Sequence, residues 1–361
     1  MGILFYQASP HWSGSSRAFA VAARGLAART NDVTVVCRAS SPASEGFTAE
    51  GLEVVPVHGG RTVAGDVWRL RAILKKRAVD VLFVHSEREQ LVASTAARFS
   101  ERAAVVRRIH AGGSALSGRN GRIAGKLAAT QILYAMDSDR MRDGLANRAL
   151  LAPLGVDVTR VDEVRAESRR MLGLDDATQL IACAIDAQAG SRVTTAMRTL
   201  ALLADRHRDL RVAFVGRAAD ADDTRMHAAA LGVTSLAHFL GERHDSPAVL
   251  AAADVGWVAS EGDDGAFASL DFMAARVPII AERSALISQY VPDGIAGVLL
   301  PTGDPADTAS AVARFLSDAE KRTAMGNAGR TRARRDFGEE AMIDGFARAA
   351  NVGGRVPEDA R

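Results

Sequence analysis

Residues 258–280 read VASEGDDGAFASLDFMAARVPII, and this stretch decides how the rest of the chain is interpreted. The apolar run that ends at Val258 is typical of a buried strand, and residues 266–275 are helix-forming and contain neither Pro nor Gly. A small, acidic segment with two glycines, residues 260–265, lies between them, and residues 277–280 begin a further strand. The predicted order is therefore strand, acidic loop, helix and strand.

The predicted entry into this helix is also a predicted ligand site. A helix that begins at such a loop directs the backbone N–H groups of its first turn toward the loop, where phosphate or sugar hydroxyls can bind. Asp263 lies in the loop, and Asp271 lies eight positions later, about two turns into the helix. Both carboxylates can therefore reach one ligand.

Length and composition indicate the class of protein. The 361 residues are too many for one ordinary core and suit two domains. The two cysteines, Cys37 and Cys183, each lie in an apolar strand-like run, which indicates a reduced protein with inert buried thiols. Because the N-terminus lacks the basic segment of a signal peptide and no apolar run is as long as a membrane span, we expect a cytoplasmic protein.

The charge is distributed unevenly along the chain. The net charge of +2 combines +9 over residues 1–160 with −7 over the remainder. A basic first half favours an anionic partner, such as a membrane surface, a lipid phosphate or nucleic acid. A solvated, Arg-rich surface explains the same count equally well, so both interpretations stay open.

The first half of the chain alternates predicted strands and helices. Residues 3–8, 18–28 and 32–37 form a strand, a helix and a second strand, which is the repeating unit of a parallel, doubly wound sheet. The first loop, residues 11–17, has one glycine and no G-x-G-x-x-G, so the dinucleotide-binding fingerprint is absent. Its small residues either admit a ligand to the helix entry or form an ordinary loop with a Ser cap.

Two histidines lie at the ends of predicted strands, where ligands of open α/β sheets bind. Residues 79–85 end in His85, and residues 103–110 end in His110, which a Gly-rich segment follows. Each is either a ligand-binding residue or a structural hydrogen-bonding group, and His110 is the better candidate. Residues 112–126 are predicted to be a basic loop, which is either mobile and faces an anionic acceptor or is a plain surface loop.

The second half repeats the alternation and sets the predicted domains. A turn with Pro153 and Gly155 is predicted to link the two halves. The predicted parts are an acceptor domain (residues 1–158), a donor domain (159–336), a C-terminal helix that crosses back to the first domain (337–350) and a disordered tail (351–361).

The motifs, taken in order, resemble the retaining glycosyltransferases of family 4 (group 1), which have the GT-B fold. Their signature is roughly P-S-x-x-E-G-F-G-x-x-x-x-E-A-M-A-x-G-x-P-V, and both of its glutamates fall on aspartates here, Asp263 and Asp271, at unchanged spacing. Gly14 and Arg17 match a first-loop G-x-x-R, and His110 matches a strand-end histidine. The resemblance extends over about residues 2–350 and implies two Rossmann-like α/β domains facing each other across a cleft.

The chain departs from the family at a second loop. The family has G-R-x-x-x-x-K-G there, whose Arg and Lys bind the donor diphosphate. Asp186 stands where the Arg is expected and Ser191 where the Lys is expected. A carboxylate beside a diphosphate is unfavourable. Three other arginines are candidate replacement cations: Arg192, Arg217 and Arg243.

The resemblance also implies roles for individual residues. Asp271 is expected to bind the donor ribose and His110 to contact the sugar near its anomeric carbon. Asp263 is expected to bind the sugar hydroxyls together with backbone N–H groups. Further residues implied on the donor side are Gly14, Gly265, Ala266 and Phe267, and those implied on the acceptor side are Arg17, His85 and Arg119.

The implied activity is metal-independent sugar transfer with retention, with no cofactor, in cell-envelope polysaccharide synthesis. The implied partners are a nucleotide-sugar donor, a glycan or lipid-linked acceptor and an anionic surface of the inner membrane, and no nucleic acid. Two alternatives stay open. One is a degenerate GT-B protein that binds a ligand or partner without catalysis, and the other is a nucleotide-sugar epimerase.

Overall fold

The computed structural model describes residues 1–58, 62–101, 103–115, 118–128, 130–161, 164–175, 177–186, 190–204, 206–207 and 209–353. Two compact units make up the chain. Unit 1 comprises Met1–Leu154 and the segment that begins at Glu339, and unit 2 comprises Gly155–Gly338. The last helix of the chain therefore belongs to unit 1, and the first change of unit falls four residues before the predicted position of 158.

Unit 1 is built on one parallel sheet of seven strands in the order β3-β2-β1-β4-β5-β6-β7. Its strands are β1 (Gly2–Gln7), β2 (Asp32–Arg38), β3 (Val54–Val57), β4 (Val81–Val84), β5 (Ala104–Ile109), β6 (Thr130–Tyr134) and β7 (Leu150–Leu151). Its helices are α1 (Gly14–Ala28), α2 (Pro42–Ala49), α3 (Val63–Lys76), α4 (Glu87–Ser100), α5 (Arg119–Leu127), α6 (Asp137–Arg142) and α15 (Glu339–Gly353).

Unit 2 repeats this arrangement with six parallel strands in the order β10-β9-β8-β11-β12-β13. Its strands are β8 (Gln179–Ala184), β9 (Leu210–Val215), β10 (Ala237–Gly241), β11 (Val255–Val258), β12 (Ile279–Glu282) and β13 (Gly297–Leu300). Its helices are α7 (Arg165–Met171), α8 (Gly190–Ala204), α9 (Asp222–Ala230), α10 (Ser246–Ala251), α11 (Gly262–Ala274), α12 (Ile287–Tyr290), α13 (Pro305–Ser317) and α14 (Ala319–Asp336). Short 3-10 turns cover Val158–Val161 and Thr234–Leu236.

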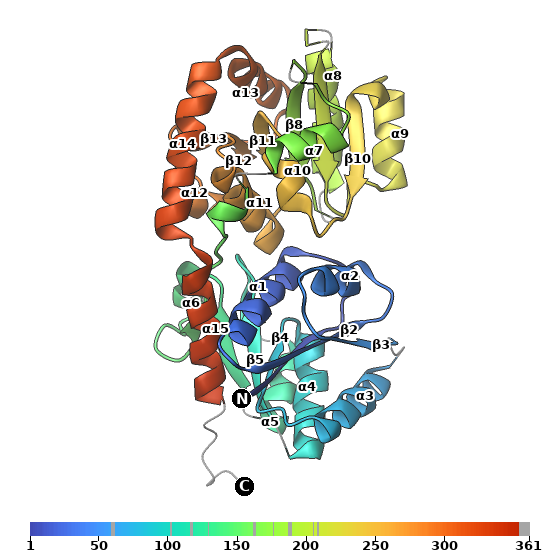
Figure 1. Ribbon diagram of the computed structural model, residues 1–361, viewed down its shortest axis with the longest axis vertical. Helices are drawn as coiled ribbons and strands as arrows, with labels where there is room; N and C mark the ends of the chain where they lie inside the picture. The colour runs from blue at the N-terminus through green and yellow to red at the C-terminus, as the bar shows by residue number, and fades with distance from the viewer. Residues whose placement is uncertain are drawn as a thin grey trace. The chain divides into compact units, whose positions relative to one another are not determined.

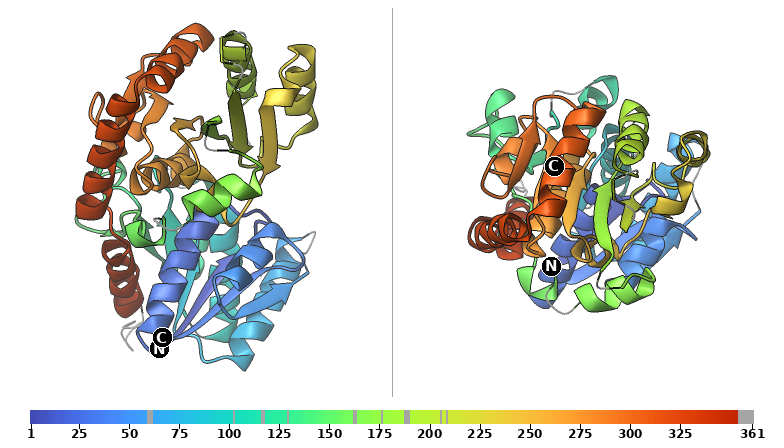
Figure 2. Two further views of the ribbon diagram at one scale, coloured as in Figure 1. Left: turned by 45° about the horizontal axis from the view of Figure 1, so that its top comes forward. Right: turned by 90° about the horizontal axis from the view of Figure 1, so that it is seen from above.

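Helices cover both faces of each sheet (Figures 1 and 2). In unit 1, α3, α4 and α5 pack side by side, and α15 packs against α1. Phe346 of α15 packs against Phe5, Phe19 and Phe83 in tilted and edge-to-face pairs, with ring centroids 5.2–6.4 Å away. In unit 2, α8 packs between α9 and α13, while α11 packs against α10 and α14. Strands buried on both faces explain why the sequence shows them as continuous apolar runs.

Local sequence signals fix where many of these helices begin. Ser13 and Ser86 form capping boxes with residues three positions later, so the amides of each first turn are hydrogen-bonded. Asp304 caps α13, and Pro305 occupies its first position, where a missing N–H costs nothing. Cys37 and Cys183 are free and buried, as expected.

Several predicted elements differ from the structure. Two helices, α2 and α7, were not predicted, and α5 replaces most of the predicted basic loop at residues 112–126. The helix predicted at residues 266–275 begins four residues earlier, at Gly262. Helix α15 continues through Gly353 into the predicted tail, and the rest of that tail, residues 354–361, lies outside the described residues.

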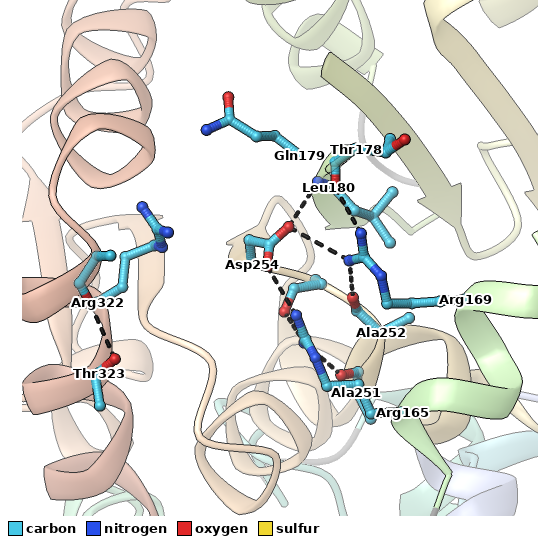
Figure 3. A network of polar contacts seen from close by, with 12 residues as sticks. Arg165, Arg169, Thr178, Gln179, Leu180, Ala251, Ala252, Asp254, Arg322 and Thr323 are labelled. Atoms are coloured by element: carbon cyan, nitrogen blue, oxygen red, sulfur yellow. Dashed lines mark hydrogen bonds and ion pairs between the residues drawn. The ribbon is translucent and has the colours of Figure 1, made fainter. Parts of the chain in front are cut away.

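A network of polar contacts braces unit 2 at the start of β8 and β11 (Figure 3). The Asp254 carboxylate accepts from the Leu180 N–H at 2.9 Å and pairs with the guanidinium of Arg165 at 2.7 Å and of Arg169 at 3.4 Å. Both arginines lie on α7 and also donate to backbone carbonyls of residues 251–253 at the end of α10. The Asp254 carboxylate therefore links α7 to the sheet, and the same two arginines link α7 to the end of α10.

We expect Asp254→Ala to lower the free energy of unfolding of unit 2 by about 2 kcal/mol, because two guanidinium groups and one amide lose their acceptor. The Asp254 side chain is 22% exposed, so water compensates part of the loss. Urea denaturation followed by circular dichroism measures the change. Asp318→Ala, which removes only the cap of α14, should cost about 1 kcal/mol, and equal effects of the two variants would contradict a special role of the network.

Candidate functional site

Each sheet has a switch point, where the chain order reverses between its two central strands. In unit 2 it lies between β8 and β11, and in unit 1 between β1 and β4. Ligands of open α/β sheets bind outside the carboxyl ends of the strands at such a point. The residues that follow these four strands are therefore the candidate site residues of each unit.

At the switch point of unit 2, β11 leads into α11 through a tight turn. Gly265 packs directly on the Ser260 carbonyl, and a Cβ at Gly265 would lie 2.3 Å from that oxygen. The Gly265 N–H donates to the Glu261 carbonyl at 3.0 Å, which closes the first turn of the helix. This amide is therefore engaged within the helix, and Gly265, Ala266 and Phe267 are all buried, while the predicted role of these residues in donor binding stays a prediction.

The two candidate carboxylates both lie on α11. Asp263 is its second residue rather than part of a preceding loop, and it is 3% exposed. Asp271 is 2% exposed. Eight residues of helix separate the two Cα atoms by about 12 Å along the axis, so the carboxylates can bind opposite parts of one elongated ligand.

The residue that replaces the expected Arg contacts the entry of α11. The Asp186 carboxylate follows β8 and accepts a hydrogen bond from the backbone N–H of Glu261 at 2.8 Å. The Glu261 carboxylate in turn pairs with the guanidinium of Arg192. Arg192, predicted to bind a donor phosphate, is therefore neutralised by Glu261, a residue that the sequence analysis did not single out. The Ser191 side chain and residues 187–189 lie outside the described residues.

A pocket of about 720 Å³ opens beside this ion pair, along the carboxyl ends of β11, β12 and β13. Arg192 and Glu261 line one side, and Glu282 and Asp304 contribute two further carboxylates. Trp257 supplies an apolar wall. The lining therefore offers several acceptors for hydroxyl groups but only one guanidinium for an anion.

The other two predicted cations lie at the same edge of the sheet. Arg217 is exposed in the turn after β9. Arg243 follows β10 and makes two hydrogen bonds to Asp245, at 2.7 and 2.6 Å, which hold the pKa of Asp245 below its usual range. Arg243 is therefore already paired with a carboxylate.

In unit 1, α1 begins at Gly14, four residues before the predicted start of this helix at residue 18, so Gly14 and Arg17 lie in the helix and not in the predicted loop. Gly14 is the first residue of the helix and is buried, and Arg17 is half-buried one turn later. Glu89, which the sequence analysis missed, joins the two sides of the switch point. Its carboxylate accepts from the N–H groups of Ala8 at 2.7 Å and His85 at 3.1 Å.

The two candidate histidines have different surroundings. The His85 ring stacks on Phe19 with centroids 3.6 Å apart, and both ring nitrogens are buried. This packing favours a structural role, and the acceptor-side role of His85 stays a prediction. His110 is exposed at the end of β5, where its ring can reach a ligand.

The segment after His110 is anchored rather than loose. Asp139 accepts from the Gly112 N–H at 2.7 Å, and Asp143 accepts from Ser114 and from the Ala115 N–H at 2.8 and 2.7 Å. Burial raises the pKa of Asp143, but hydrogen bonds from Tyr134, Ser114 and Ala115 outweigh it and lower that pKa. These hydrogen bonds hold residues 112–115 to residues 139–143, and residues 119–126 form a helix where a loop was predicted.

Arg119 was predicted to lie in that basic loop and lies instead in the first turn of α5, where it is exposed. The sequence GRNGRIAGKL around it contains three glycines, which explains the error. Residues 116–117 lie outside the described residues.

Two family models match the chain. The model of Glycosyltransferase Family 4 matches residues 12–188, and that of Glycosyl transferases group 1 matches residues 180–318. The chain belongs to the group 1 glycosyltransferases. The predicted family is thus confirmed.

Similar proteins agree with this assignment. The D-inositol 3-phosphate glycosyltransferase of Corynebacterium jeikeium is 29% identical over 189 residues, which make up 49% of this chain and 45% of that relative. This glycosyltransferase chain spans less than half the length of the curated relatives that it matches first.

Among solved structures, Anabaena HepE in complex with UDP-glucose has a TM-score of 0.77 at 17% identity, over 98% of this chain and 100% of that one. A glycosyltransferase from Rickettsia africae has a TM-score of 0.75 at 12% identity, over 99% of both chains. At this level of identity the likeness shows the fold alone, and it confirms the predicted pair of Rossmann-like domains of GT-B type.

Within the described part of the chain, no helix is both long and apolar enough to cross a lipid bilayer. No group of three or more His, Cys, Asp or Glu side chains gathers there in the way a metal ion needs. The predicted contact with an anionic membrane surface and the cytoplasmic location stay predictions.

Proposed function

We propose that this group 1 glycosyltransferase moves a sugar from a nucleotide-activated donor to an acceptor, with retention and without a metal ion. The observation that carries the proposal is the pair Asp263 and Asp271, buried on α11 at the switch point of unit 2. Their spacing equals that of the two glutamates of the family motif. HepE, a protein of the same fold, is described as a complex with UDP-glucose, which supports a nucleotide-sugar donor.

The proposed chemistry assigns one part of the donor to each carboxylate. Asp271 binds the ribose hydroxyls, and Asp263 binds hydroxyls of the sugar. As the nucleoside diphosphate leaves, negative charge develops on it and is stabilised by the positive end of the α11 dipole. Of the three candidate cations, Arg217 has no ion pair among those found in the described residues, so it is the first candidate to bind a phosphate.

The test is calorimetric titration with UDP, GDP and their sugar conjugates, together with a donor hydrolysis assay. We expect one nucleotide to bind in the micromolar range and its sugar conjugate to be hydrolysed slowly in the absence of acceptor. Failure of every nucleotide to bind would refute the proposal.

Metal independence has its own measurement. We expect transfer to continue unchanged in excess EDTA, because the proposed charge stabilisation comes from the helix dipole and arginine side chains. Restoration of lost activity by Mg²⁺ or Mn²⁺ would contradict this part of the proposal.

A second candidate function is ligand binding without catalysis, in a degenerate GT-B protein. It is favoured by the contact of Asp186 with the entry of α11 and by the Arg192–Glu261 pair. This candidate predicts nucleotide binding without hydrolysis or transfer, so the same two assays separate the two functions.

His110→Ala is expected to lower turnover by about a hundredfold, because removing one group that stabilises charge at the reacting centre has that effect in other enzymes. The affinity for the nucleotide should stay the same. His58→Ala, at another exposed histidine after a strand of the same sheet, serves as the matched control. Equal turnover in the two variants would remove His110 from the site.

The acceptor is proposed to be a glycan or a lipid-linked molecule. The relative named D-inositol 3-phosphate glycosyltransferase makes inositol phosphate the first small acceptor to test. Salt-sensitive sedimentation with anionic vesicles tests the proposed membrane contact, and absence of binding at low salt would reject it.

A further inference from the structure

Helices α3, α4 and α5 pack side by side in unit 1 and form what we call the α3–α5 layer (Figure 1). The three helices contain nine Lys and Arg residues against three Asp and Glu residues, a net charge of +6. Eight of the nine basic residues are exposed, whereas none of the three acidic residues is. Glu101, which directly follows α4, is exposed and lowers the net charge only to +5. The outer surface of this layer is therefore strongly basic.

The acidic residues of the α3–α5 layer already have partners. The Asp66 carboxylate pairs with the guanidinium groups of Arg69 at 3.5 Å and Arg88 at 2.7 Å. The carboxylates of Glu87 and Glu89 each accept from a backbone N–H at 2.7 Å. The ion pairs found within the described part of the chain involve none of the other six exposed basic residues, which are Lys75, Lys76, Arg98, Arg119, Arg122 and Lys126. These six cations can therefore meet an external anionic surface.

Two large aromatic side chains adjoin each other on this basic surface. Trp68 of α3 is 61% exposed, and Phe99 at the end of α4 is 58% exposed. Arg71 connects them, because its guanidinium carbon lies 5.1 Å from the centroid of the Trp68 ring and its Nε donates to the Phe99 carbonyl at 3.2 Å. On α5, Ile123 is 41% exposed among the basic residues. Each helix of the layer thus presents one large apolar side chain to the outside.

The combination of charge and apolar side chains indicates the kind of partner. A solvated surface explains exposed Lys and Arg, but it gives Trp68 and Phe99 no favourable place for their rings. A nucleic-acid duplex complements the charge and offers no apolar region for these rings to enter. An anionic lipid surface provides both, since basic residues contact its headgroups while aromatic rings enter the region just beneath them.

We propose that the α3–α5 layer docks on an anionic lipid surface, with Trp68 and Phe99 as its apolar anchors. The inference rests on the membrane contact that forms part of the proposed function, and it assigns that contact to one surface of unit 1. It involves none of the residues proposed to bind the donor.

The position of the three tryptophans makes insertion directly measurable. Trp12 and Trp257 are 8% and 7% exposed, so Trp68 is the one tryptophan of the chain that a vesicle can reach. The full chain is titrated with vesicles of phosphatidylcholine with and without phosphatidylglycerol. We expect the tryptophan emission to shift to shorter wavelength only with phosphatidylglycerol, and the shift to disappear at high salt. Trp68→Phe should abolish the shift. Equal binding to both kinds of vesicle, or binding without a shift, would overturn the inference.

Sedimentation with the same vesicles measures the anchors. Trp68→Ala and Phe99→Ala should each weaken binding to the anionic vesicles by about tenfold, because each removes apolar surface that the lipid buries. Met226→Ala is the matched control, since Met226 is 68% exposed on α9 of unit 2. Circular dichroism shows whether each variant is folded.

A second pair of variants measures the charge. Replacing both Lys75 and Lys76 by Gln should weaken binding by about fivefold for each charge removed. Replacing Lys321 and Arg334 by Gln is the matched control, because it removes two exposed charges from α14 of unit 2.

Three further results would refute the inference. If anionic vesicles bind and the α3–α5 variants behave like their controls, the inference is wrong, and the proposed membrane contact stands at another surface. If a DNA duplex binds more tightly than the vesicles at the same salt concentration, the assignment to lipid is wrong. If no vesicle binds at low salt, the inference and the proposed membrane contact both fail, while nucleotide titration decides on sugar transfer independently.

Discussion

Asp271→Ala is expected to abolish measurable binding of the nucleotide-sugar donor, a loss of at least about a hundredfold in affinity. Asp271 is 2% exposed in the middle of α11 (Gly262–Ala274). A hydrogen bond between a ligand and a charged group contributes roughly 1.5–3 kcal/mol, and shielding from water keeps it at the upper end. A carboxylate that binds two ribose hydroxyls therefore supplies a large part of the binding free energy of a complex with micromolar affinity.

The matched control is Asp264→Ala, which removes an exposed carboxylate from the first turn of the same helix. We expect it to change affinity by less than about threefold, since exposed charges contribute little. Asp271→Glu, which introduces the residue of the family motif, should retain binding. Thermal denaturation shows whether each variant is folded. Donor binding by folded Asp271→Ala at the level of Asp264→Ala would exclude the ribose contact.

The architecture was predictable from the sequence because parallel sheets bury their strands on both faces. The runs DVTVVC at residues 32–37 and LRVAFVG at residues 210–216 are apolar for this reason, and both are strands. Helix α2 was missed because PASEGFTA has too few apolar residues to show a helical period. Its Ala43 and Phe47 are nevertheless buried, so tertiary packing rather than propensity forms the helix.

The candidate site was predictable only in part. The motif gave the eight-residue spacing of Asp263 and Asp271, because that spacing is a property of local sequence, but it placed Asp263 in the loop, whereas the structure places it in the first turn of α11. The contact between Asp186 and Glu261 joins residues 75 positions apart, and the pairing of Arg192 with Glu261 spans 69. Long-range contacts of this kind have no local signal. The sequence could therefore show that Asp186 replaces the expected arginine, but not which groups the Asp186 carboxylate contacts.

Gly265→Ala is expected to destabilise unit 2 strongly. A Cβ at this position would lie 2.3 Å from the Ser260 carbonyl oxygen and 2.8 Å from its carbon, and both atoms belong to the backbone. Neither can move aside without displacing the turn between β11 and α11 (Gly262–Ala274). We expect a loss of about 3 kcal/mol in the free energy of unfolding, at the upper end of overpacking effects, and a fall in the melting temperature of unit 2 of about 6–12 °C.

Gly125→Ala is the matched control, because the same substitution there introduces a Cβ with no atom within 4 Å. Gly125 lies inside α5 (Arg119–Leu127), where alanine favours the helix by about 0.5–1 kcal/mol relative to glycine. The two variants should therefore shift stability in opposite directions, although the chemical change is identical. Calorimetry that resolves the two units measures both effects. Equal shifts in stability would show that the turn before α11 accommodates an added methyl group. The close contact between Gly265 and Ser260 would then have no role in positioning Asp263 and Glu261 at the switch point.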